Sequence, residues 1–330
     1  AEVDQGTNPL DGLPAVTGII ASADTPGTAV DIAAFNDIAV VADSDRGVSV
    51  LSVVNGTSPV IIAQVDTPGT AQAVAFFSNL VAVADGAAGL AIIDVTDPPA
   101  ARIIYQIDLG GTAQAVTTDG RVAYVGLSTG QVVAVDMVSA TELGRVTVGG
   151  AVQDVALGGD YLYVFTSGTL HAIALDDFTV AGSTASPGFA RVRRQRLFVG
   201  GGIAYAVQDQ GYNTLNLANP AQPVLIASGI TQQTGWKQIV ANGSGLGVAA
   251  VGVTPSDQTH DVYLYDVSNP ALTNQFLTLF PTPGRAEAVS IYNGLAYVAD
   301  GQAGMQVINY LAYDSQGISP TITLSTNFAP

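Results

Sequence analysis

The sequence has no cysteine, one lysine and only two histidines among its 330 residues. The absence of cysteine excludes disulfide bonds, thiolate metal sites and cysteine nucleophiles. The two histidines, His171 and His260, are too few for a multi-histidine transition-metal site. Charged residues make up 11% of the chain, against about 25% in an average globular protein. The polar surface must therefore come mostly from serine, threonine, asparagine, glutamine and the backbone.

The few charges that are present are mostly negative. The chain has 27 acidic and 10 basic residues, which gives a net charge of −17. A field of this sign repels nucleic acids and anionic lipids, because proteins bind both through lysine and arginine. No apolar run approaches the ~18–20 residues that a membrane-spanning helix needs. We therefore expect no nucleic-acid partner and no membrane insertion.

A repeated motif is the most prominent feature that the sequence does contain. A Thr-Pro-Gly segment, or a glycine-containing variant of it, precedes a short apolar run at residues 25–32, 67–74, 110–116, 149–155, 186–193, 235–239 and 282–289. Successive copies lie about 40 residues apart, which is the period of a propeller blade with four strands. The seven copies therefore predict seven blades.

The interior of one unit supports this interpretation. In the second unit, short apolar runs at residues 72–76, 80–84, 90–95 and 103–108 are separated by turns rich in Gly, Asn, Asp and Pro. Runs this short and this rich in β-branched residues have the character of strands, without a helical period. We predict an all-β, seven-bladed β-propeller with four antiparallel strands in each blade.

The seventh unit supplies only three strands, at residues 286–290, 295–299 and 305–310. The segment 16–21 precedes the first motif and belongs to no earlier unit, so it is expected to fill the missing place and close the ring. We assign residues 15–314 to the propeller and residues 1–14 to a linker that leads into it. Residues 315–330 are interpreted as a linker into a following domain.

The third strands carry a further signature. The segments Gly89–Pro98, Thr214–Pro220 and Val262–Pro270, together with Tyr297–Gly301, resemble the LVIVD-repeat family of bacterial β-propellers. The resemblance covers about residues 15–313 and implies a propeller within a large exported or surface protein. The family has no settled reaction, so the resemblance assigns no catalytic residue. We expect an extracellular or cell-surface location, and a monomeric module of a larger chain that has a protein or a carbohydrate as partner.

Four aspartates are candidates for a Ca²⁺ site on the face that carries the Thr-Pro-Gly segments. They occupy the second turns of the first, second and seventh units: Asp43, Asp45, Asp85 and Asp300. Ca²⁺ binds several carboxylate and carbonyl oxygens at once. The alternative is hairpin chemistry, in which aspartate caps the turn and glycine takes a positive φ. Calcium is the only cofactor that the sequence suggests.

A second candidate site is a ring of polar residues at the channel mouth. One equivalent position of the innermost strands holds Gln72, Gln114, Gln153, Arg191, Lys237 and Glu287, with Val30 in the first unit. These side chains are expected to bind a polar ligand or a sugar, or else to bond to one another and to channel water. Asp31 and Asp154, one residue later, are expected to point the other way. Trp236 either stacks on a sugar or packs in the core.

The arginine-rich segment 191–196 holds four of the nine arginines. It is either an anion or partner site, or a salt-bridged patch in an acidic protein. Gly126–Gly130 fits the Gly-x-Ser-x-Gly pattern of serine hydrolases, but no helix is expected after it to form a nucleophile elbow.

Two functions remain open at this point. The first is a non-enzymatic binding or scaffold module of a bacterial secreted or cell-surface protein. The second is a carboxylate- or Ca²⁺-dependent hydrolase or lyase that acts at the channel mouth. The second function requires two or more acids to converge, whereas the first requires only a rigid surface. The sequence shows no nucleophile–base pair, which favours the first.

Overall fold

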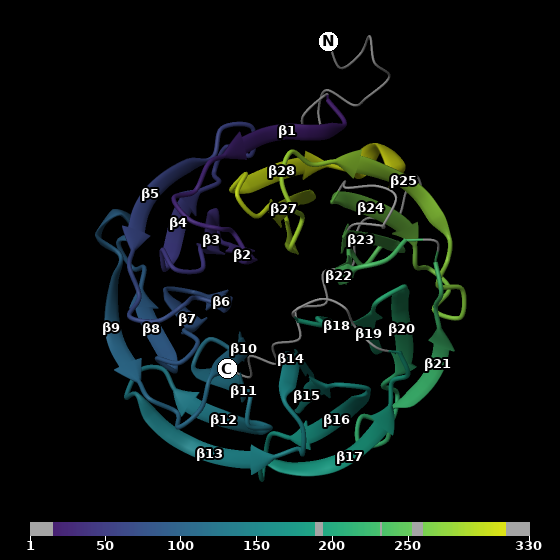
Figure 1. Ribbon diagram of the computed structural model, residues 1–330, viewed down its shortest axis with the longest axis horizontal. Helices are drawn as coiled ribbons and strands as arrows, with labels where there is room; N and C mark the ends of the chain where they lie inside the picture. The colour runs from purple at the N-terminus through teal and green to yellow at the C-terminus, as the bar shows by residue number, and fades with distance from the viewer. Residues whose placement is uncertain (1–15, 189–193, 232, 253–259, 315–330) are drawn as a thin grey trace, which may run out of the picture.

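The computed structural model describes residues 16–188, 194–231, 233–252 and 260–314. Seven four-stranded antiparallel sheets surround a central axis like the blades of a propeller (Figure 1). The predicted fold class is therefore confirmed. The proposed linkers at residues 1–14 and 315–330 lie outside the described residues.

Blades 1 to 4 are each formed by four consecutive strands. They are β2 (Asp31–Phe35), β3 (Ile38–Ala42), β4 (Val48–Ser52) and β5 (Val60–Val65); β6 (Ala73–Phe77), β7 (Leu80–Ala84), β8 (Leu90–Asp94) and β9 (Arg102–Ile107); β10 (Ala113–Thr118), β11 (Val122–Leu127), β12 (Gln131–Asp136) and β13 (Thr141–Thr147); and β14 (Val152–Gly158), β15 (Tyr161–Thr166), β16 (Thr169–Ala174) and β17 (Thr179–Ala185).

Blades 5 and 6 follow the same plan, and blade 7 takes its outer strand from the start of the chain. The strands are β18 (Leu197–Gly200), β19 (Ile203–Gln208), β20 (Gly211–Asn216) and β21 (Val224–Ser228); β22 (Trp236–Ala241), β23 (Leu246–Val251), β24 (Asp261–Asp266) and β25 (Phe276–Pro281); and β26 (Ala288–Tyr292), β27 (Leu295–Ala299), β28 (Met305–Asn309) and β1 (Gly18–Ala23). In every blade the first strand is innermost.

The ring closes as the sequence predicts. Strand β1 pairs with β28 in antiparallel orientation, from Gly18 opposite Asn309 to Ala23 opposite Met305. The outermost strand of each blade, β1 included, contains one extra residue that breaks the register with its neighbour. Such a β-bulge increases the local twist and makes an exposed edge a poor template for further pairing.

Each junction between blades has its own apolar core. The buried apolar residues that the structure describes form seven clusters, and each cluster joins two neighbouring blades. The first and second blades meet through Val40, Val50, Val81 and Val83, which are fully buried. This explains why the middle strands are apolar on both faces: each face packs against a different blade.

Blade 5 has a different register from the one that the repeat predicts. The motif alignment places Arg193 at the position of Val155 and Ile239, but β18 begins at Leu197, and Leu197 lies in the core between blades 4 and 5. The correct steps on either side, from Val155 to Leu197 and from Leu197 to Ile239, are both 42 residues. The prediction for this unit was therefore four residues too early.

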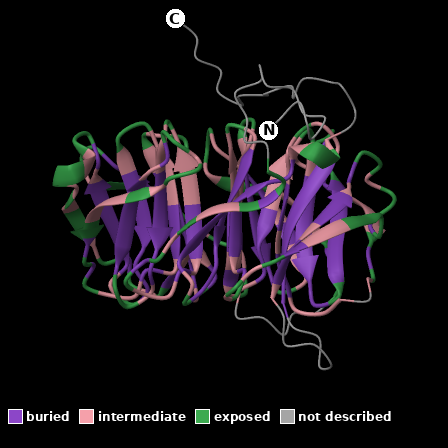
Figure 2. Ribbon diagram, turned by 90° about the horizontal axis from the view of Figure 1, so that it is seen from above, coloured by how far each residue is buried: buried purple, intermediate pink, exposed green. Residues whose placement is uncertain are grey.

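The disc has two faces that carry loops (Figure 2). We call the face with the Thr-Pro-Gly segments and the turns between second and third strands the Thr-Pro-Gly rim. The opposite face, with the hairpins between first and second strands, is called the hairpin rim. The helices in the described part are the 3-10 turns η1 (Pro98–Ala100) and η2 (Leu311–Tyr313), and no helix there is long and apolar enough to cross a membrane.

Candidate functional site

An ion-pair network spans the central channel at blade 5. Just before β18, Arg196 reaches Asp31 of blade 1, with 2.6 Å between its Nη1 and Oδ1 of Asp31. Its Nη2 donates to the carbonyl of Val30 at 2.6 Å. The side chains of Arg196 and Asp31 are 6% and 8% exposed, so this pair is almost dry. The guanidinium thus ties blade 5 to blade 1, which is not its neighbour in the ring.

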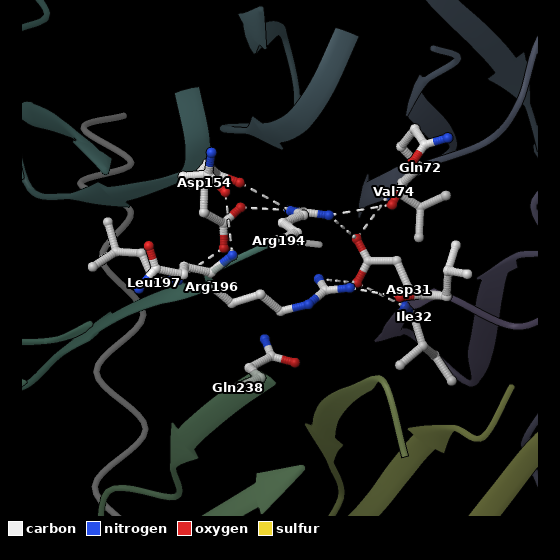
Figure 3. A network of polar contacts seen from close by, with 12 residues as sticks. Asp31, Ile32, Gln72, Val74, Asp154, Arg194, Arg196, Leu197 and Gln238 are labelled. Carbon is white, nitrogen blue, oxygen red and sulfur yellow. Dashed lines mark hydrogen bonds and ion pairs between the residues drawn. The ribbon is translucent and has the colours of Figure 1, made fainter. Parts of the chain in front are cut away.

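Arg194 links three other points of the ring. Its guanidinium pairs with Asp154 of blade 4 and, at 3.4 Å, with Asp31. It also donates to the carbonyl oxygens of Gln153 and Gln72, at 3.1 and 3.2 Å. Figure 3 shows the two guanidinium groups lying between Asp154 and Asp31. The network therefore holds two positive and two negative groups in the channel.

The carboxylates also fix the neighbouring inner strands. Asp31 accepts from the backbone N–H of Val74 in the next blade at 3.1 Å. Asp154 makes the equivalent bond to Leu197 at 2.8 Å. The carbonyl oxygen of the Gln238 side chain does the same for Val289 at 2.7 Å. This position of the inner strand thus joins successive blades wherever its side chain can accept a hydrogen bond.

Burial and charge compete in this network. For Arg194, burial disfavours the charged form, but the carboxylates of Asp154 and Asp31 outweigh it and raise the pKa of the guanidinium. For Arg196, burial is the larger effect and lowers the pKa despite Asp31. Both remain cations, because an arginine side chain is not deprotonated in proteins. The channel charges are therefore neutralised by pairing and not by loss of protons.

The sequence analysis missed this network. It expected Asp31 and Asp154 to point away from the channel, and the structure shows that this was wrong. A signal was present: Asp31 and Asp154 occupy a position where the other blades have Ala73, Ala115 or Ala288. Two acidic residues at a position that is otherwise small, in a chain with one cluster of arginines, indicate ion pairs.

The predicted polar ring is brought together only in part. Gln72, Gln114 and Gln153 are partly buried at equivalent positions of blades 2, 3 and 4. With the corrected register, the blade 5 member is Gln195, which is 4% exposed and donates to the carbonyl of Val207 at 3.0 Å. Arg191 is not the equivalent residue, and it lies outside the described residues.

Lys237 and Glu287 form a pair of their own at the junction of blades 6 and 7. Nζ of Lys237 lies 2.9 Å from Oε1 of Glu287 and donates to the carbonyl of Ala286 at 2.9 Å. Burial lowers the pKa of Lys237. Among the ring positions that the structure describes, these two groups therefore serve each other, which is the structural alternative considered for the ring.

Trp236 is a core residue. Its side chain is fully buried, with its ring centroid 5.1 Å from that of Tyr265 and 5.5 Å from that of Tyr212. Its Nε1 donates to Oγ1 of Thr231 at 3.1 Å. No face of the indole is open to a sugar from solvent, so the packing alternative holds for this residue.

The candidate calcium ligands are separated by their own turns. Oδ1 of Asp43 accepts from the Thr25 hydroxyl at 2.6 Å, and Oδ1 of Asp85 accepts from Thr67 at 2.7 Å. All three buried aspartates, Asp43, Asp85 and Asp300, are 0% exposed, whereas Asp45 is exposed. Within the described ranges, no three acidic or histidine side chains are grouped so that they could hold a metal ion. The calcium site therefore stays a prediction.

These contacts explain the Thr-Pro-Gly motif. The backbone N–H of Gly69 donates to Oδ2 of Asp85 at 2.9 Å, and Gly284 donates to Asp300 at the same distance. A Cβ on Gly69 would lie 2.1 Å from the carbonyl oxygen of Asp85, so only glycine fits. The motif therefore locks the loop between blades onto the turn of the following blade.

The protonation of the rim aspartates follows from their neutral partners. Burial raises the pKa of Asp43 and of Asp85, although hydroxyl and N–H donors oppose it. In blade 7 the hydroxyl of Thr282 donates to the carbonyl of His260 at 2.6 Å. Burial raises the pKa of Asp300 to about 6, against the opposing effects of Thr282 and Gly284. Asp300 therefore exchanges its proton closest to neutral pH.

The hairpin rim carries a pocket of about 350 Å³ between blades 1 and 2. Its walls come from the β2–β3 and β6–β7 turns and from the segments that follow β4 and β8. Ile38, Phe76 and Val95 supply apolar surface, and Asp37 and Asn79 supply polar groups. The sequence analysis did not find this pocket, because it forms from four loops of two units.

The fold and the paired channel define this chain as a seven-bladed β-propeller. LVIVD repeats are matched at four places, residues 26–67, 68–104, 149–170 and 283–309, so the chain carries the repeat that its third strands resemble. No curated protein sequence matches the chain.

Solved structures show the same fold at low sequence identity. The β-propeller domain of Myceliophteria thermophila Cps50 (Swd1) is 13% identical, with a TM-score of 0.71 over 89% of this chain and 99% of that one. U3-55K is 11% identical, with a TM-score of 0.68 over 88% and 98%. The computationally designed Ika8 protein is 10% identical, with a TM-score of 0.66 over 89% and 100%. These likenesses establish the fold alone.

Proposed function

We propose that this propeller is a non-enzymatic binding module of a bacterial secreted or cell-surface protein, and that it binds its partner through the hairpin rim. The observation that carries the proposal is the pocket between blades 1 and 2, a concave site with apolar walls and a few fixed polar groups. Binding sites generally combine these features. The channel is a poorer candidate, because its four charges are already paired.

The rigidity of the pocket supports binding. The backbone N–H of Asp37 donates to the Tyr292 hydroxyl at 3.0 Å, and that hydroxyl donates to Oδ1 of Asp37 at 3.1 Å. Nδ2 of Asn79 donates to Oγ1 of Thr96 at 2.8 Å. A surface whose loops are already held loses little conformational entropy when a partner binds.

A matched pair of variants tests the location of the site. Val54 is 74% exposed at the lip of the pocket, and Val138 is 65% exposed at the corresponding place in blade 3, two residues beyond its third strand. The wild-type propeller and the variants Val54→Arg and Val138→Arg are immobilised and exposed to arrays of extracellular proteins and glycans. We expect Val54→Arg to abolish the retained signal and Val138→Arg to preserve it. Equal binding by both variants would refute the site.

The same preparations distinguish binding from catalysis. Ester, glycoside and polyuronate substrates are incubated with the wild-type protein in the presence and absence of Ca²⁺. The binding module is expected to show no turnover. Turnover that disappears in Asp300→Asn would instead favour the competing interpretation, a carboxylate- or Ca²⁺-dependent hydrolase or lyase.

A further inference from the structure

The pocket on the hairpin rim has a chemistry that narrows its ligand. Only one of its lining side chains is ionisable, and that side chain is the acid Asp37. The whole chain adds a net charge of −17. No positive group in the pocket compensates a ligand anion, so phosphorylated and carboxylated ligands meet repulsion there. The pocket therefore selects against anions.

The polar groups of the pocket are suited to hydroxyl groups. Asn36 and Asn79 provide amides, each of which can donate and accept, and the carboxylate of Asp37 accepts. The three residues lie on two adjacent hairpin turns, β2–β3 and β6–β7. Neighbouring hydroxyls of one molecule can bond to such a set from both sides, because each hydroxyl is itself a donor and an acceptor.

The apolar wall is suited to a C–H surface. Phe76 lines the pocket, and its ring packs edge-to-face on Phe35 with 6.0 Å between centroids and an interplanar angle of 84°. The face of an aromatic ring is electron-rich and attracts the weakly positive hydrogens of C–H groups. Ile38 and Val95 extend this apolar wall. The packing of Phe76 fixes its ring before any ligand arrives.

From these three features we propose that the pocket binds one ring of a neutral sugar, with its hydroxyls on the asparagine and aspartate side chains and its C–H face toward Phe76. The inference rests on the proposed binding function and names its ligand class. The volume of about 350 Å³ is at the small end of the range for ligand pockets, which suits a single ring and not an extended chain.

The direct test uses methyl glycosides of glucose, galactose, mannose and N-acetylglucosamine, with saturation-transfer NMR and calorimetry on the whole propeller. We expect saturable binding of at least one glycoside at millimolar concentration. Glucose 6-phosphate should bind more weakly than glucose if the negative field governs selection. Stronger binding of the phosphate, or binding of an organic cation in place of every glycoside, would overturn the inference.

Two asparagines at the same turn position provide the matched control. Asn36 follows β2 and Asn293 follows β26, and both have a positive φ, of 50° and 48°. Replacement by alanine strains both turns in the same way, but only Asn36 lines the pocket. We expect Asn36→Ala to weaken glycoside binding about tenfold, as the loss of one hydrogen bond implies. Asn293→Ala should leave binding unchanged.

The possible failures are distinguishable. If no glycoside binds while Val54→Arg still removes a partner that Val138→Arg retains, the sugar inference fails and the binding function stands. If a glycoside binds but Asn36→Ala and Asn293→Ala weaken it equally, the ligand lies elsewhere and the inference fails. If Val54→Arg and Val138→Arg behave alike, the proposed site itself is wrong.

Discussion

The channel and the Thr-Pro-Gly rim bury carboxyl groups in two different ways. In the channel, Asp31 and Asp154 face the guanidinium groups of Arg194 and Arg196. On the rim, Asp43 and Asp85 have only threonine hydroxyls, other neutral side chains and backbone N–H groups as partners, and their pKa values are raised. The comparison teaches that pairing keeps the channel charged, whereas neutral donors leave the rim acids poised to hold a proton.

The largest effect should follow from breaking the channel pairs. Arg196→Met keeps the apolar stem but leaves Asp31 without its closest cation, at 2.6 Å in the native protein. An uncompensated buried charge costs about 3–5 kcal/mol, so the free energy of unfolding should fall by about that amount. Urea denaturation followed by tryptophan fluorescence measures it.

A surface pair serves as the control for this variant. Arg121 pairs with Asp136 at 3.0 Å, but its side chain is 79% exposed. Arg121→Met should cost less than about 1 kcal/mol. The double variant Asp31→Asn/Arg196→Met should lose less stability than the two single changes added together. Strict additivity would show that the two groups do not interact.

The second effect concerns pH and the rim. The pKa of Asp300 is raised from an ordinary 3.8 to about 6, so the folded state binds this proton more tightly than the unfolded state. The resulting stabilisation is complete below about pH 4 and is lost as the pH rises through about 6. Asp300→Asn should therefore remove up to about 3 kcal/mol of pH dependence between these values, as measured by denaturation at each pH. A variant with the native slope would contradict the assignment.

A smaller effect should separate two equivalent threonines. Thr67 donates to Asp85 at 2.7 Å, whereas Thr282 donates to the His260 carbonyl. Thr67→Val leaves a buried carboxyl oxygen without its donor and should cost about 1–3 kcal/mol. It should also raise the pKa of Asp85 further, which carbon-detected NMR titration can follow. Thr282→Val should leave the pKa of Asp300 less affected than Thr67→Val leaves that of Asp85.

The smallest expected effect is that of calcium. Because Asp43, Asp85 and Asp300 lie in separate turns, we expect the same melting temperature in millimolar Ca²⁺ and in a chelator. Calorimetric titration provides the second measurement. A rise in melting temperature that Asp300→Asn or Asp85→Asn removes would establish the calcium site that the sequence suggests.

The repeat predicts the ring, and the reason is physical. Units of about 40 residues, each with strands that are apolar on both faces, can bury those faces only against one another. Even the closing strand is predictable, because residues 16–21 have the pattern of a fourth strand without a unit of their own. The prediction fails where one unit, blade 5, departs from the motif and the spacing alone must decide that Leu197 is the inward residue.

The sites are less predictable than the fold. Asp31 and Arg196 are 165 residues apart and belong to blades that are not neighbours. Only the closed ring places them across one channel. The pocket depends likewise on four loops from two units, and no single segment carries its pattern. The rim aspartates could be found from the sequence, because each bonds within its own repeat.

The joint between β1 and β28 gives the ring an uneven response to mechanical tension. Six blades are each one continuous segment, whereas blade 7 joins the first and last strands that the structure describes. A pull on the chain at Val16 and Asp314 would act first on the backbone hydrogen bonds of this one strand pair. The other blades, including the pocket between blades 1 and 2, would feel the force only after that pair had parted.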